Sequence, residues 1–140
     1  MDEKDVENIM QHPLTMIASD GRLVVPGEGH PHPRWYGTFP RVLGHFVRER
    51  GTLSLEEAIY KMSLLPAETI GIKNRGLIKK GMFADITIFD KNTIIDKATF
   101  EDPHQYSEGI YYVLVNGSVA IDEGKFQNIK AGVVLKKNEP

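Results

Sequence analysis

The feature that most constrains the fold is a short apolar run, residues 14–18, that leads into Ser19-Asp20-Gly21. The run shows no alternation of polar and apolar side chains, which is typical of a parallel strand buried on both faces. Asp20 would then stand at the C-terminal end of that strand, where ligands and catalytic groups collect in α/β folds. Asp-Gly is also a common turn pair, so a simple turn-capping role for Asp20 is an equally open interpretation.

The residues before this run predict a short helix. Asp2 can cap a helix over residues 2–11, and His12-Pro13 ends it because the residue before a proline is pushed out of the helical region. Helix, short loop and buried strand follow one another as at the end of a repeating α/β unit. We therefore expect that a chain starting here has lost the units that came before.

A loop of about 16 residues, 22–37, follows the predicted strand, and loops of this length are usually functional or disordered. His30 and His32 have a spacing that could place two imidazoles on one metal, but both precede prolines and no third ligand is near in sequence. A loop-packing role is the favoured interpretation for this pair. Arg34 could grip an anionic substrate through a bidentate pair, whereas its residue type alone favours a surface salt bridge.

The next segments predict helices with packing roles. Residues 38–50 carry apolar side chains at helical spacing and stop at Gly51, and His45 lies off that apolar stripe, as expected of a solvated histidine. Residues 54–57 form a capping box that opens a second helix. Pro66 can start a further short helix that ends before Gly71.

From about residue 76 the pattern changes to short β strands. Residues 81–90 are β-rich, and the flanks of Asn116-Gly117, residues 110–115 and 118–121, predict a hairpin. Residues 132–135 could add a last edge strand. His104 lies in a polar loop without a neighbouring catalytic partner, so a structural role is favoured for it. The chain thus divides into an α/β part and a small antiparallel β part.

Composition excludes several classes of function. With 140 residues and a net charge of −2, the chain gives no electrostatic reason to expect nucleic acid or an anionic membrane as a partner. The chain has no cysteine and therefore no disulfide framework or thiolate metal site. No apolar run approaches the ~18 residues of a membrane span, and the N-terminus lacks the apolar core of a signal peptide. A cytoplasmic location is the resulting expectation.

Several motifs together resemble the C-terminal region of the D-aminoacylases, the N-acyl-D-amino-acid deacylases of the metal-dependent amidohydrolase superfamily. The specific series is Ser19-Asp20-Gly21, then His32-Pro33-Arg34, then Tyr-Gly-Thr-Phe-Pro-Arg-Val-Leu-Gly at residues 36–44. The resemblance covers nearly the whole chain and thins over its last residues. It continues in residues 53–58, 79–90, 103–110 and 115–117.

This resemblance implies an α/β fold, namely the C-terminal end of a (β/α)8 amidohydrolase barrel with part of a small antiparallel β-sandwich domain. Residues 1–75 would hold the last strand and the C-terminal helices of the barrel. Residues 76–140 would belong to the small β domain, with residues 79–90 leading out of the barrel into it.

The resemblance also implies a zinc site to which the last barrel strand brings Asp20. In the family this carboxylate binds metal, takes a proton from the metal-bound water and hands it to the leaving amine, so Asp20 would be metal ligand and general acid/base. Zinc can lower the pKa of its water to about 7, and an ionised carboxylate beside it can accept the proton. Arg34 matches the arginine that holds the carboxylate of the substrate, and its donor fork suits that anion.

The other metal ligands of the family, a cysteine and histidines on earlier strands, have no counterpart in these 140 residues. His30 and His32 follow Asp20, whereas the His-x-His of the superfamily lies at the first barrel strand. We therefore expect the last third of an enzyme, inactive on its own, with most of its zinc site supplied by residues that this chain lacks.

The predicted function is that of a C-terminal fragment of a zinc-dependent hydrolase that deacylates N-acyl-D-amino acids, with a small-molecule N-acyl amino acid as its partner. Two alternatives stay open. One is another amidohydrolase that acts on cyclic or linear amides, and the other is a non-catalytic binding or assembly module that keeps the tail of the fold.

Overall fold

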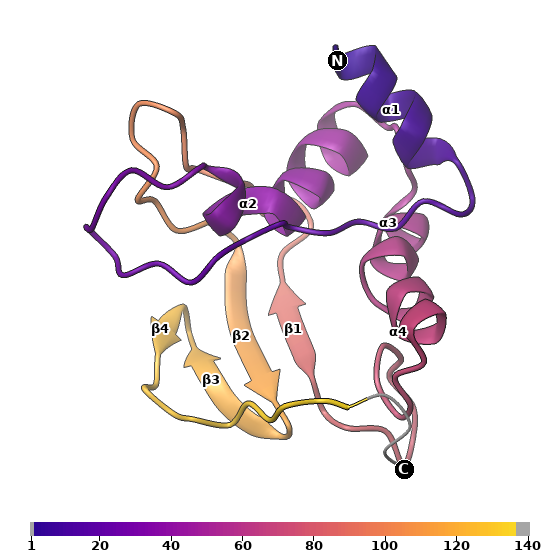
Figure 1. Ribbon diagram of the computed structural model, residues 1–140, viewed down its shortest axis with the longest axis vertical. Coiled ribbons are helices and arrows are strands. Elements are labelled where there is room, and N and C mark those ends of the chain that lie inside the picture. The colour runs from indigo at the N-terminus through magenta and orange to yellow at the C-terminus, as the bar shows by residue number, and fades with distance from the viewer. Residues whose placement is uncertain (1, 137–140) are drawn as a thin grey trace.

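The computed structural model describes residues 2–136, with helices grouped on one side and a small sheet on the other (Figure 1). The order along the chain is four α-helices, interrupted by one π-helix, and then four strands. The helices are α1 Glu3–Gln11, α2 Arg34–Arg41, the π-helix η1 Val42–Glu49, α3 Leu55–Met62 and α4 Leu64–Ile70. The strands are β1 Ile86–Phe89, β2 Ile110–Val115, β3 Ser118–Asp122 and β4 Lys125–Phe126. Among the described residues, no helix combines the length and the apolar character needed to cross a membrane.

Helix α1 forms where the sequence predicts it. The Asp2 carboxylate accepts a hydrogen bond from the backbone N–H of Asp5, and the Asp5 carboxylate accepts one from the Asp2 N–H. This reciprocal capping box satisfies two of the amide groups that a helix start leaves unpaired. The helix ends at His12, whose backbone is extended ahead of Pro13.

The predicted parallel strand over residues 14–18 is wrong for this structure. The segment pairs with no strand, and Leu14 and Met16 are 77% and 36% exposed. A parallel strand needs neighbouring strands for its backbone groups, and the described residues place none beside it. The segment instead runs along α3, where the Ile17 N–H donates to the Lys61 carbonyl at 3.0 Å.

The helical stretch predicted over residues 38–50 begins earlier, at Arg34, and changes type at Val42, where the α-helix becomes a π-helix. Pro40 lies inside α2 and has no N–H to bond the carbonyl four residues before it, that of Tyr36. The Ser107 hydroxyl donates to that carbonyl at 3.3 Å instead. A segment from the second half of the chain therefore supports α2 at its proline.

Of the two following helices, α3 begins at its predicted start signal, whereas α4 begins before the predicted Pro66. The Ser54 hydroxyl accepts a hydrogen bond from the Glu57 N–H, and the Glu57 carboxylate accepts from the Ser54 N–H, so α3 also begins with a capping box. Helix α4 begins at Leu64, two residues before Pro66. It ends at Gly71, which has the left-handed backbone (φ 77°) that ends many helices.

The strands form one antiparallel sheet in the order β1-β2-β3-β4. Asn116 and Gly117 join β2 to β3 with φ values of 50° and 82°, the two left-handed residues that a two-residue hairpin of type I′ needs. This confirms the predicted hairpin. The predicted edge strand over residues 132–135 is wrong, because that segment forms no strand and β4 takes the edge position.

One hydrophobic cluster joins the helices to the connection between β1 and β2. Ile94 is 1% exposed and packs in a cluster with residues of α1, η1 and α3. The cluster consists of Met10, Val42, Leu43, Phe46, Leu53, Ala58 and Ile94. Packing against it places the 99–109 segment, which follows Ile94 in the chain, beside α2 (Figure 1).

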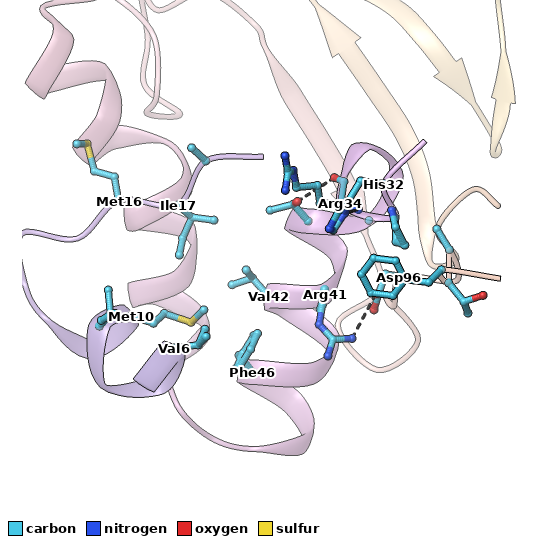
Figure 2. A pocket seen from close by; sticks show the side chains of 18 of the residues that line it. Val6, Met10, Met16, Ile17, His32, Arg34, Arg41, Val42, Phe46 and Asp96 are labelled. Carbon is cyan, nitrogen blue, oxygen red and sulfur yellow. Dashed lines mark hydrogen bonds and ion pairs between the residues drawn. The ribbon is translucent and has the colours of Figure 1, made fainter. Parts of the chain in front are cut away.

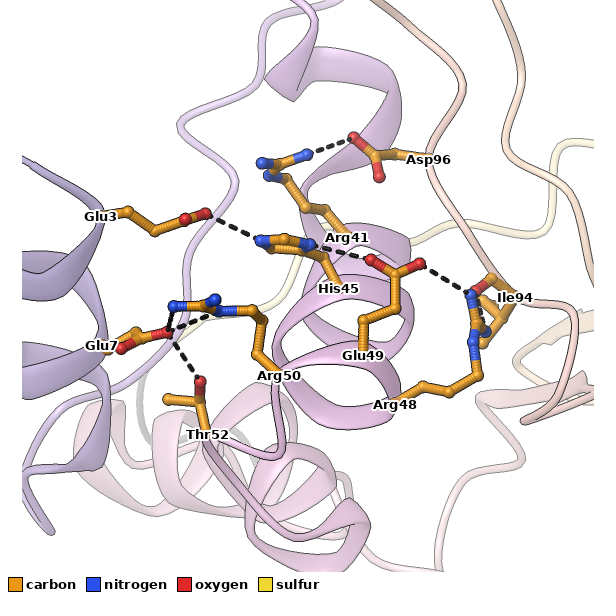
Figure 3. A network of polar contacts seen from close by, with 10 residues as sticks. All are labelled: Glu3, Glu7, Arg41, His45, Arg48, Glu49, Arg50, Thr52, Ile94 and Asp96. Carbon is orange, nitrogen blue, oxygen red and sulfur yellow. Dashed lines mark hydrogen bonds and ion pairs between the residues drawn. The ribbon is translucent and has the colours of Figure 1, made fainter.

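A charged network fastens α1 to η1 (Figure 3). His45 lies between Glu3, at 2.8 Å from its Nε2, and Glu49, at 3.0 Å from its Nδ1. The Arg50 guanidinium contacts the Glu7 carboxylate at 2.9 Å. The predicted solvated His45 is thus wrong, because its side chain is only 21% exposed and bridges two elements.

Candidate active site

Asp20 lies at the end of the extended segment and has a left-handed backbone, with φ 47°. Aspartate is among the few residues that tolerate this conformation, because its short side chain can hydrogen-bond locally. The following Gly21 N–H donates to the Ser19 hydroxyl at 3.2 Å, which closes the turn. The Asp20 carboxylate is left 82% exposed, so it is available to a partner from outside this turn.

Arg34 is that partner. It is the first residue of α2, and its Nη2 lies 2.6 Å from Oδ2 of Asp20, 14 positions earlier in the chain. The structure therefore brings together the two residues that the sequence analysis selected as general acid/base and substrate anchor. The contact is also the surface ion pair that the residue type of Arg34 favours, since the two side chains are 42% and 82% exposed.

His30 and His32 are used to hold the loop that joins Asp20 to Arg34. The His30 Nε2 lies 2.7 Å from the Phe100 carbonyl oxygen, and the His32 ring packs edge-on against the Phe100 ring with centroids 5.0 Å apart. The His32 Nδ1 accepts a hydrogen bond from the Arg34 N–H. These contacts agree with the loop-packing interpretation of the pair.

Arg34 also borders a cavity of about 640 Å³, a volume within the usual range of ligand sites. Figure 2 shows Arg34 and His32 on one side of this cavity and the apolar Val6 and Met10 on the other. Asp20 is not among the lining residues, so Arg34 stands between the cavity and the carboxylate. Arg34 places a positive charge at the border of this cavity.

Tyr36 is a residue of this region to which the sequence analysis gave no role. Its hydroxyl lies 3.0 Å from Nδ1 of His104, which is 68 positions away. Burial raises the pKa of the Tyr36 hydroxyl, and Tyr106 raises it further, so the hydroxyl keeps its proton at neutral pH. The motif containing Tyr36 is visible in the sequence, but no local pattern links it to a histidine so distant.

The described residues do not form a zinc site by themselves. Within residues 2–136, no group of three or more histidine or acidic side chains lies close enough together to hold a metal ion. Zinc sites in proteins use three or four protein ligands, and Asp20 is one carboxylate. Its exposed position leaves room for it to complete a site whose other ligands come from elsewhere.

Comparison with known proteins gives a consistent result. The profile of the Amidohydrolase family matches residues 4–121. A D-aminoacylase of Alcaligenes xylosoxydans xylosoxydans is 46% identical over 98% of this chain and 28% of its own length.

Solved structures agree. A D-aminoacylase structure described by its binuclear metal centre matches with a TM-score of 0.87, at 45% identity, over 94% of this chain and 27% of that one. The N-acyl-D-glutamate deacylase of Bordetella bronchiseptica, in complex with zinc and a phosphonate inhibitor, matches with a TM-score of 0.80, at 45% identity, over 86% of this chain and 25% of that one. The chain spans about 28% of the length of the curated D-aminoacylase that it matches. On this evidence the chain belongs to the amidohydrolase family.

Proposed function

We propose that the chain is the C-terminal part of a zinc-dependent N-acyl-D-amino-acid deacylase, a hydrolase that releases a carboxylate and a free D-amino acid. The observation that carries the proposal is the Asp20–Arg34 pair, because it puts a proton acceptor and an anion-binding group in one place. The similarity to a D-aminoacylase and to an N-acyl-D-glutamate deacylase supports the same substrate class.

The fold assignment extends this proposal. Residues 1–75 are the last strand and the C-terminal helices of a (β/α)8 barrel, and residues 76–140 are part of its small β-sandwich domain. The 15–18 segment, which has no regular secondary structure in the isolated chain, supports this, because neighbouring barrel strands would both pair with it and cover the exposed Leu14 and Met16. The strand that is missing from the isolated chain would then form on assembly with the rest of the barrel.

Asp20 acts as the general acid/base. Its Oδ2 accepts from Arg34, while Oδ1 has no hydrogen-bond partner among the described residues and can accept a proton from the attacking water. The same oxygen then donates the proton to the amine nitrogen as the carbon–nitrogen bond of the amide breaks. A zinc ion, to which Asp20 would contribute one ligand, supplies the Lewis acid that lowers the pKa of water to about 7.

Arg34 binds the carboxylate of the substrate. It uses Nη2 for Asp20, which leaves further N–H groups of its guanidinium for a second anion. The position of Arg34 at the edge of the cavity supports this role, because the acyl and side-chain groups of a bound substrate could enter the apolar part. Asp20 and Arg34 thus act on opposite ends of the amino-acid half of the substrate.

The test is a substrate comparison on the full-length protein that carries this chain. N-acetyl-D-amino acids, their L enantiomers and a cyclic amide are assayed before and after removal of metal with a chelator. We expect hydrolysis of the D substrates alone, loss of activity on chelation and recovery on addition of zinc. Hydrolysis of the cyclic amide alone would show instead an amidohydrolase of another substrate class.

A further inference from the structure

A histidine from the second half of the chain holds the loop between Asp20 and Arg34. His104 is half-buried, and its Nδ1 lies 3.3 Å from the Gly27 backbone nitrogen and 3.0 Å from the Tyr36 hydroxyl. Its Nε2 lies 3.2 Å from the Gly29 carbonyl oxygen. Figure 1 shows the 21–33 loop and the segment that carries His104 side by side, next to α2.

Only one protonation state of His104 satisfies all of these contacts. The Gly27 N–H can only donate, so Nδ1 must be an unprotonated acceptor. The Gly29 carbonyl can only accept, so Nε2 must carry the proton. The ring is therefore neutral, and the Tyr36 hydroxyl and the Gly27 N–H share the single lone pair of Nδ1. If Nδ1 also carried a proton, its N–H would face the Gly27 N–H, and two donors cannot form a hydrogen bond with each other.

A series of contacts in the loop connects His104 to Arg34. Tyr36 is two residues after Arg34 on α2, and the Asp20–Arg34 pair closes the two ends of the loop. Between these points, His32 binds the Arg34 N–H with its Nδ1 and packs on Phe100. Residues 100–107 therefore contact the middle of the loop, its last residues and the start of α2. The position of the Arg34 side chain depends on these contacts.

We propose that neutral His104 is a positioning residue that holds the 21–33 loop against α2 and thereby aims Arg34 at the carboxylate of the substrate. The proposal rests on the function proposed above for Arg34. The aromatic rings beside His104 are Tyr36 from α2 and, beyond it, Tyr106 from its own segment. Among the described residues, no charged side chain forms an ion pair or hydrogen bond with His104.

The support of the loop is tested by hydrogen exchange on the full-length protein that carries this chain. In His104→Ala, we expect the Gly27 amide to exchange at least about tenfold faster, since it loses its acceptor. The amides of β2 and β3 report whether the fold is intact and should keep their protection. His12→Ala, which changes a histidine at the end of α1, is the control and should leave Gly27 unchanged. An unchanged Gly27 rate in His104→Ala overturns the proposal.

The positioning role is tested by kinetics on the full-length enzyme. His104→Ala should raise KM for an N-acetyl-D-amino acid about tenfold and change kcat less than about twofold, because Asp20 is untouched. His104→Asn places its Oδ1 where Nδ1 stands, so it keeps the acceptor and should restore KM.

Two results separate this proposal from the proposed function. If the full-length wild-type protein hydrolyses no N-acyl-D-amino acid, the proposed function fails, and the Gly27 exchange rate still decides whether His104 holds the loop. If the wild-type protein is active and His104→Ala lowers kcat with KM unchanged, His104 does not position Arg34. A KM that stays raised in His104→Asn also overturns the proposal, because asparagine keeps an acceptor where Nδ1 stands.

Discussion

At the scale of single residues, the Asp20 and Arg34 side chains lie close together, but the ion pair between them contributes little free energy. Both side chains are substantially exposed, and exposed ion pairs contribute about 0–1 kcal/mol, since water competes for both charges. The contact therefore offers little resistance when further N–H groups of Arg34 turn toward a substrate carboxylate.

The substitution Asp20→Asn tests the acid/base role. Asparagine keeps the shape and tolerates the left-handed backbone, but it cannot accept the proton, so we expect kcat of the full-length enzyme to fall at least about 10²-fold. Turnover and zinc content are measured on the same sample. Normal turnover with normal zinc would leave Asp20 as a turn residue. Loss of zinc together with activity would make it chiefly a metal ligand.

The substitution Arg34→Lys tests the substrate anchor. A point charge replaces a planar donor fork, so KM for N-acetyl-D-amino acids should rise about tenfold or more while kcat changes less. Arg22→Lys is the matched control, because Arg22 is an exposed arginine of the same loop without a hydrogen bond or ion pair among the described residues. Equal kcat/KM values for Arg34→Lys and Arg22→Lys would remove Arg34 from the site.

At the scale of elements, α2 and η1 approach the 94–96 segment through glycines. A Cβ on Gly37 would lie 2.6 Å from the Cβ of Asp96, and one on Gly44 would lie 2.5 Å from the Ile94 carbonyl oxygen. These two glycines are seven residues apart and face the same neighbour. The close approach brings the start of the 99–109 segment beside α2, on which the support of the Arg34 loop depends.

Gly44→Ala should therefore destabilise the fold by about 1–3 kcal/mol, the usual cost of overpacking. If helix propensity alone governed this position, alanine would instead stabilise it by about 1 kcal/mol. Denaturant unfolding measures the sign directly. Gly132→Ala is the control, since a Cβ at Gly132 would contact nothing, and it should leave the midpoint nearly unchanged.

The contact between α1 and the end of η1 should depend on pH. A hydrogen bond from Arg50 lowers the pKa of the Glu7 carboxyl, whose side chain is 9% exposed. A lowered folded-state pKa stabilises the fold above the unfolded pKa, and this contribution is lost as the pH falls through the folded pKa.

Glu7→Gln should accordingly lower stability at pH 7, and its deficit relative to wild type should shrink below about pH 4. Thermal unfolding at a series of pH values measures the difference. Glu101→Gln, at an exposed carboxylate without a hydrogen bond or ion pair in the described part, should show no such trend. A Glu7→Gln deficit that is constant with pH would mean that the effect is one of packing.

At the scale of the whole molecule, one core serves both halves of the chain. Ile94, from the connection between two strands, is the most buried large side chain and packs among residues of three helices. Several exposed apolar residues lie along the extended segment, at Leu14 and Met16, and farther on at Leu23 and Val25. The core therefore joins the helices to the sheet. The segment on either side of Asp20, in contrast, has apolar side chains that are exposed to solvent.

This arrangement predicts that the 140 residues alone bind zinc poorly and hydrolyse no N-acyl-amino acid. One carboxylate cannot supply the three or four ligands that zinc needs, and His30 and His32 are engaged by the Phe100 segment. Calorimetric titration of the purified chain with zinc is the measurement, with the full-length protein as the positive control. Tight binding of one zinc ion per chain would contradict the prediction.

Local signals in the sequence determined several elements. The capping boxes at Asp2 and Ser54 and the hairpin at Asn116-Gly117 form as predicted, because their hydrogen bonds and backbone angles involve residues at most three positions apart. The motif series also led to Asp20 and Arg34 before any contact between them was visible. Such features need no information from distant parts of the chain.

The tertiary structure alone decided the rest. Residues 14–18 have the apolar pattern of a strand, but a strand exists only where neighbours accept its hydrogen bonds, and the described chain offers it α3 instead. Glu49 lies one helical turn from His45, but the Glu3 partner of His45 and the loop partners of His104 lie 42 to 77 positions away, where no local pattern reveals them. The physical reason is common to these cases: a backbone amide, an imidazole or a carboxylate takes its role from the group that meets it in space, and only packing decides which group that is.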